Sequence, residues 1–83
     1  MATIVIKIDG AKYKVNCKDL IPVVSSHFEL EVDKNKWDYV EFCDIVQKLP
    51  HEAIIKFIND NTNTEVKSQN PISFEIEKPD TIW

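Results

Sequence analysis

The dipeptide Asp9-Gly10 constrains the fold of this chain most strongly, because Gly10 is the only glycine among 83 residues. An Asp-Gly pair tolerates the positive φ angles of a tight turn and is among the strongest short-range indicators of a β-hairpin. Residues 3–8 and 12–17 alternate apolar and polar side chains on either side of it, which is strand period. We therefore predict an N-terminal hairpin whose inward side chains are Ile4, Ile6, Ile8, Tyr13, Val15 and Cys17.

The next stretch predicts a short helix and then a strand. Residues 18–24 form the expected helix, which Asp19 can cap, and Pro22 is tolerable there only within the first turn. Residues 28–32 alternate apolar and acidic side chains, which favours a strand. A competing capping-box spacing starts at Ser26 and would instead begin a second helical turn.

A further strand is expected over residues 37–42, after a polar turn. Its alternation would place Val40 and Phe42 on one face and Tyr39 and Glu41 on the other.

The second half of the chain changes to helical period. Ile54, Phe57 and Ile58 lie three and four residues apart, and Pro50 suits the start of a helix. The elements expected here are helices over residues 44–49 and 50–58, a loop over 59–64, a short strand at 65–67 and a last strand over 72–76.

Size and charge narrow the functional classes. The length predicts a single domain over residues 1–83, with a core that is marginal without a disulfide, a metal or a partner chain. The net charge of −4 disfavours nucleic acid and anionic membrane surfaces as partners. No apolar run is long enough to span a membrane, and no secretory signal is visible. Two separated cysteines favour reduced thiols in the cytoplasm or nucleus.

No side-chain pattern indicates catalysis, a metal or a cofactor. His27 and His51 have no second His or Cys at a short metal-ligand spacing. Nothing near Cys43 in the sequence identifies a base, so we interpret it as a small buried hydrophobe. A single glycine rules out a glycine-rich phosphate loop. We expect a protein that is not an enzyme, although a small thiol enzyme that uses Cys43 is the alternative from a different class.

The aromatic side chains suggest a binding surface. In the strand expected over residues 37–42, Trp37 and Tyr39 lie opposite the apolar face. Aromatic residues on a surface favour contact with a protein partner, unless a helix covers that face.

The order of these elements resembles the BTB/POZ superfamily, and within it elongin C and the S-phase-kinase-associated adaptor. The hairpin and the pattern Ile21-x-x-x-Ser25-x-x-Phe28 resemble the opening strands and first helix of that family. Val40-Glu41-Phe42 looks like its third strand, and residues 50–58 look like the helix that follows. The C-terminal helices that receive F-box or SOCS-box partners in the adaptors have no counterpart before the chain ends at Trp83.

The resemblance implies an α+β, BTB/POZ-like fold with a small mixed sheet flanked by short helices. It also implies a non-catalytic protein–protein interaction module, with a cullin of a ubiquitin-ligase assembly or a second copy of the chain as partner. The partner-binding residues expected from the aromatics and from the resemblance are Trp37, Tyr39, Glu41, His51 and Lys56. A ubiquitin-like β-grasp binding domain is the alternative fold, which the strand at residues 28–32 would favour.

Overall fold

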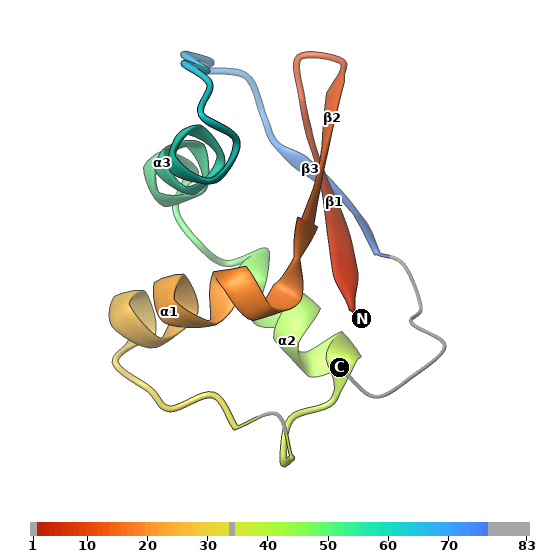
Figure 1. Ribbon diagram of the computed structural model, residues 1–83, viewed down its shortest axis with the longest axis vertical. Helices are drawn as coiled ribbons and strands as arrows, with labels where there is room; N and C mark the ends of the chain where they lie inside the picture. The colour runs from red at the N-terminus through yellow and green to blue at the C-terminus, as the bar shows by residue number, and fades with distance from the viewer. Residues whose placement is uncertain (1, 34, 77–83) are drawn as a thin grey trace.

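The structure is a computed structural model that describes residues 2–33 and 35–76. The elements follow the order β1 (Thr3–Ile8), β2 (Ala11–Asn16), α1 (Cys17–Phe28), α2 (Tyr39–Val46), α3 (His51–Thr62) and β3 (Ser73–Ile76). The helices lie to one side of the sheet (Figure 1). The predicted α+β class is confirmed, with an N-terminal hairpin, a third strand and three helices in the described residues.

The hairpin forms where Asp9-Gly10 predicts it. Both turn residues have positive φ angles, 50° for Asp9 and 82° for Gly10, as the turn types that match strand twist require. The strand order is β2-β1-β3, and β1 is antiparallel to both neighbours. The sheet of the described residues is therefore purely antiparallel, and the expectation of a mixed sheet was wrong in this detail.

One face of the sheet forms the core. Ile4 and Ile6 are 0% exposed and Ile8 is 2% exposed, and the register places Val15 and Tyr13 beside the first two. The predicted inward set of the hairpin is thus correct, although Tyr13 is only partly buried. The helices cover this face.

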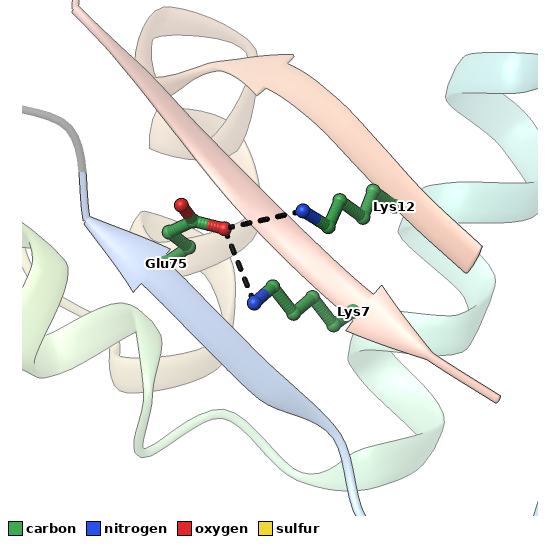
Figure 2. A network of polar contacts seen from close by, with 3 residues as sticks. All are labelled: Lys7, Lys12 and Glu75. Atoms are coloured by element: carbon green, nitrogen blue, oxygen red, sulfur yellow. Dashed lines mark ion pairs between the residues drawn. The ribbon is translucent and has the colours of Figure 1, made fainter. Parts of the chain in front are cut away.

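The opposite face carries Lys7, Lys12, Lys14 and Glu75 around Val5, which is 7% exposed. The Glu75 carboxylate is 3.2 Å from the Lys7 ammonium and 3.9 Å from that of Lys12 (Figure 2). Exposed ion pairs of this kind contribute little to stability.

Helix α1 is longer than predicted and ends at Phe28. Its N-terminal cap position is Asn16 rather than Asp19, and Pro22 lies inside the helix rather than in its first turn. A proline at this position removes one intrahelical hydrogen bond, and burial of the apolar face of the helix compensates. Leu20 and Val24 provide that burial, because both are 0% exposed.

The strand predicted over residues 28–32 is absent from the structure, and so is the alternative helical turn beginning near Ser26. Glu29 adopts the left-handed conformation that ends α1, and the Leu30 N–H donates to the Ser25 carbonyl oxygen at 3.3 Å. The Leu30 N–H, which a strand would need for pairing with a neighbour, therefore caps the end of α1 instead. Leu30 and Val32 pack against the core from a loop. The β-grasp alternative loses the strand that favoured it.

The strand predicted over residues 37–42 is also wrong, because Tyr39–Val46 is helix α2. The Asp38 side chain accepts a hydrogen bond from the Glu41 N–H at 2.7 Å and caps the helix. The buried residues recur at helical spacing, and they are Tyr39, Phe42, Cys43 and Val46. The helix expected over residues 44–49 is thus only the second half of α2 and the turn after it.

Helix α3 follows the predicted pattern but extends further. It runs to Thr62, so the loop expected over residues 59–64 starts only at Asn63, whose φ is 55°. Residues 65–67 form no strand, because side chains of α3 hold this segment. The last predicted strand is confirmed as β3, which is shorter by one residue at its start.

Because α2 is a helix, alanine substitutions at Phe42 and Val40 should lower the free energy of unfolding by very different amounts. Phe42 is 0% exposed and Val40 is 56% exposed. Phe42→Ala should lower the free energy of unfolding by about 3–5 kcal/mol, whereas Val40→Ala should change it by less than about 0.5 kcal/mol. Urea unfolding followed by far-UV circular dichroism measures both. Phe42→Leu provides the comparison if the alanine variant does not fold, and equal losses at the two positions would contradict the helix.

Candidate functional site

Helix α3 is oriented by its buried face, which decides which side chains face outward. Pro50 precedes the helix, and its carbonyl oxygen accepts hydrogen bonds from Ala53 and Ile54 at 3.0 and 3.2 Å. Ile54, Phe57 and Ile58 are 3%, 8% and 0% exposed. The opposite side of the helix is therefore open, and it is bordered by a groove on each flank.

The first groove lies between α1 and α3 and has a volume of about 530 Å³. We call it the helical groove, and it is lined by Pro22, Val23, Ser26 and His27 of α1 and by Ala53, Lys56, Phe57 and Asp60 of α3. Four of these lining residues are apolar and four are polar, and the apolar ones contribute more of the exposed surface. His27 packs edge-on against Phe28, with ring centroids 4.8 Å apart. The helical groove is open to solvent and has no closed interior.

The second groove lies on the other flank of α3, beside the segment that leads to β3. We call residues 63–72 the strap, and this groove, also of about 530 Å³, the strap groove. Its lining is His51, Glu52, Ile55, Lys56, Asn59 and Asp60 of α3 with Val66, Lys67, Ser68 and Gln69 of the strap. Lys56 and Asp60 line both grooves and form the ridge between them.

Four hydrogen bonds that involve side chains hold the strap in place. The Asn59 side chain accepts from the Val66 N–H at 2.7 Å and donates to the Val66 carbonyl oxygen at 3.2 Å. His51 Nε2 donates to the Ser68 carbonyl oxygen at 2.6 Å. Asn70 Nδ2 donates to an Asp9 carboxylate oxygen at 2.5 Å and thereby links the strap to the hairpin turn. The strap groove is therefore preformed by specific hydrogen bonds.

The five predicted partner-binding residues do not lie together. Lys56 is exposed on the ridge, and His51 is half-buried at the rim of the strap groove. Glu41 is exposed on α2 and lines neither groove. Trp37 is half-buried against the core, and Tyr39 is only 8% exposed.

Tyr39 has a structural contact of its own. Its hydroxyl donates to the Thr3 carbonyl oxygen at 2.6 Å, which joins α2 to β1. The outer aromatic face expected for Tyr39 requires a strand over residues 37–42, whereas Tyr39 begins helix α2 and faces the core.

Sequence reasoning missed the α1 side of the helical groove. Pro22, Val23, Ser26 and His27 line it, and the last two lie beyond the predicted helix end at residue 24. The helical spacing of Leu20, Val24 and Phe28 was the pattern that could have extended this helix and identified its exposed side.

The two cysteines lie within the core and not in a groove. Cys17 and Cys43 are 1% and 0% exposed and free, and their thiols are close enough to hydrogen-bond. The Cys43 thiol and burial together raise the pKa of Cys17. A hydrogen bond with the Cys17 thiol, helped by one with Tyr39, lowers the pKa of Cys43, and burial and Asp44 oppose this shift. None of these groups is a histidine that could act as a base. This environment is that of two small core side chains.

The described ranges, 2–33 and 35–76, contain no group of three or more side chains that could hold a metal ion. Within the same ranges, no helix is both long and apolar enough to cross a membrane. Comparison with protein-family models, with curated proteins and with solved structures found no match to this chain.

Substitution of Asn59 tests how the strap is held. Asn59→Ala leaves the partly buried N–H and carbonyl of Val66 without their partner, so the free energy of unfolding should fall by about 1–3 kcal/mol. Hydrogen exchange of the Val66 amide should become faster in the same variant. Asn61→Ala, at an exposed position of the same helix, is the control and should change neither quantity by a comparable amount. Unchanged exchange at Val66 would contradict this role.

The contact between Asn70 and Asp9 predicts a pH dependence. Hydrogen bonds from Asn70 and Ser68 lower the pKa of Asp9 from its usual 3.8. The ionised carboxylate therefore stabilises the fold above pH 3.8, and this contribution is lost as the pH falls through the lower pKa of the folded state.

Asn70→Ala should thus be less stable than the parent protein at neutral pH, and the difference should shrink below pH 3.8. Chemical unfolding at a series of pH values measures it. Gln69→Ala, at the exposed neighbouring position, is the control. A difference for Asn70→Ala that stays constant down to pH 2 would argue against the carboxylate as the acceptor that matters.

Proposed function

We propose that this protein is a non-catalytic protein–protein interaction module that binds its partner across the open side of α3. The observation that carries the proposal is the pair of preformed grooves that flank the Lys56–Asp60 ridge. Their mixed apolar and polar lining suits a protein surface, because interfaces combine apolar contact with polar groups at the rim.

The arrangement of titratable groups supports binding rather than catalysis. Lys56 and Asp60 are exposed on a ridge, and His27 is exposed at the far side of the helical groove. A catalytic site needs a nucleophile or base positioned against a reacting atom in a sheltered pocket. Both grooves are open, and the thiols are buried elsewhere.

The partner that the family resemblance implies is a cullin in a ubiquitin-ligase assembly. The elements that support this assignment are the hairpin, the helix that carries Ser25 and Phe28, and the helix that follows Pro50. The segment compared with the third BTB strand is helical here, so the likeness rests on the other elements. Free thiols fit a cytoplasmic or nuclear setting for such an assembly.

Charge reversal on the ridge tests the proposed surface. Binding of the purified chain to the N-terminal domain of a cullin is measured by calorimetry, and amide chemical shifts locate the contact. Lys56→Glu should weaken the complex about tenfold, which corresponds to about 1.4 kcal/mol. Lys48→Glu is the matched control, because Lys48 is exposed and lies outside both grooves.

Two results would overturn parts of this proposal. Absence of binding across a panel of cullins would remove the cullin as partner. Shift changes confined to α2 or the sheet would remove α3 as the binding surface. Light scattering of the free chain measures its molar mass. The mass of a dimer would indicate a third case, in which a second copy of the chain occupies the grooves.

A further inference from the structure

The two cysteines of the chain meet in the core although they lie far apart in the sequence. Cys17 is the first residue of α1 and Cys43 lies in α2, and they are 1% and 0% exposed. Their thiols hydrogen-bond to each other, and no disulfide joins them. Two reduced sulfur atoms are therefore in contact between α1 and α2.

Backbone and side-chain contacts fix both cysteines beside the start of β1, where α1 and α2 approach each other (Figure 1). The Cys17 N–H donates to the Ala2 carbonyl oxygen at 3.0 Å. The Tyr39 hydroxyl donates to the carbonyl oxygen of the next residue, Thr3, at 2.6 Å. Cys43 follows Tyr39 by about one helical turn, so it lies on the same face of α2. The contact between the thiols therefore follows from how α1 and α2 attach to the sheet.

A covalent bond between these thiols would suit a domain of this size. A disulfide forms only between cysteines whose side chains point toward each other, and hydrogen-bonded thiols meet this requirement. The bond would enclose residues 18–42, which include nearly all of α1 and the first half of α2. A small core leaves little stability in reserve, so a cross-link over such a loop has a large effect on the unfolding equilibrium.

We propose that Cys17 and Cys43 form a reversible intramolecular disulfide when the protein meets a peroxide, and that this bond stabilises the fold. In a reducing compartment, disulfides usually take this transient, redox-sensing form. Neither cysteine lines the helical groove or the strap groove. The bond therefore acts on the stability of the domain, at a distance from the surface proposed to bind a partner.

The acidity of the two thiols assigns their roles in the reaction. The hydrogen bond between them raises the pKa of Cys17 and lowers that of Cys43, so Cys43 is the thiol that ionises first. Its thiolate attacks one oxygen of hydrogen peroxide, which breaks the O–O bond and gives a sulfenic acid on Cys43 and a hydroxide ion.

The second step closes the disulfide. The Cys17 sulfur attacks the Cys43 sulfur, and the sulfenic hydroxyl leaves as water with the proton of the Cys17 thiol. The proton released when Cys43 ionised converts the hydroxide ion to water. In total, the two thiols lose two electrons and two protons, and one molecule of peroxide becomes two molecules of water.

Burial determines which oxidant can act. Both thiols are inaccessible in the closed fold, so an oxidant reaches them only when the core opens locally. Hydrogen peroxide is close to water in size and needs only a small opening. A bulky disulfide reagent needs a larger one, so we expect it to react with Cys43 more slowly than hydrogen peroxide does.

Mass spectrometry of the folded chain tests whether the bond forms. After incubation with hydrogen peroxide without denaturant, the intact mass should fall by that of two hydrogen atoms. Trypsin cleaves after lysine and places the cysteines in separate peptides, residues 15–18 and 37–48. These peptides should appear joined, and a thiol reductant should separate them. Thiols that stay reduced, oxygen added to a single sulfur, or a bond between two chains would overturn the proposal.

Stability distinguishes a bond that suits the fold from one that forms by chance in opened chains. Urea unfolding of the oxidised chain should give an unfolding equilibrium constant about a hundredfold lower than that of the reduced chain. Cys17→Ala and Cys43→Ala each retain one thiol, so peroxide should not stabilise them in this way. If a variant does not fold, the two forms of the parent chain still decide the question. An oxidised chain no more stable than the reduced one, or an equal gain in either variant, would contradict the proposed role.

Discussion

Burial of the inner face of β1 is the constraint on which the rest of the structure depends. Ile4, Ile6 and Ile8 are almost completely removed from solvent, and each such side chain contributes about 1.5–3 kcal/mol through burial. A two-stranded hairpin cannot achieve this alone, since isolated hairpins are marginally stable in water. The hairpin itself therefore requires the third strand and the covering helices. β3 extends the apolar face of the sheet beside β1, and the helices pack their apolar side chains into the same core.

The contacts between the sheet and the segments around it lie at both ends of the hairpin. At one end, the Tyr39 hydroxyl and the Cys17 N–H donate to the carbonyl oxygens of Thr3 and Ala2. At the other end, Asn70 donates to Asp9 in the turn. Apolar burial is not directional, whereas these hydrogen bonds are, so they fix how α2 and the strap sit against the strands. The grooves beside α3 depend on that placement.

The elements that sequence reasoning found are those with a strong local determinant. Asp9-Gly10 specifies the hairpin turn, and the spacing of Ile54, Phe57 and Ile58 specifies α3. The strands predicted over residues 28–32 and 37–42 were wrong. A short alternating run forms a strand only if a neighbouring strand is available to pair with it. The Asp38 cap decided the second case, and it could have been recognised from the spacing of Asp38 and Glu41.

The candidate site was predictable only in part for a related reason. Lys56 lies on the exposed side of a helix that the sequence specifies, and it lines both grooves. The opposite wall comes from α1, whose length depends on tertiary burial of Leu20 and Val24 and on tolerance of Pro22 within the helix. The strap wall depends on the contacts of Asn59 with Val66 and of His51 with Ser68, which join a helix to a loop that has no regular structure of its own. Such walls are products of packing, and local propensity does not specify them.

The strap also connects the grooves beside α3 to the sheet. It lines a groove of α3 at one end and continues at the other into β3, which pairs with β1 on the side opposite β2. β3 is only four residues long, and its Glu75 is the carboxylate near Lys12. A partner that holds the strap against α3 therefore also favours the position of β3 and of Glu75, because binding to the folded form stabilises every contact that this form requires. Because the core of an 83-residue domain is small, such binding should add a substantial share of the stability of the whole fold.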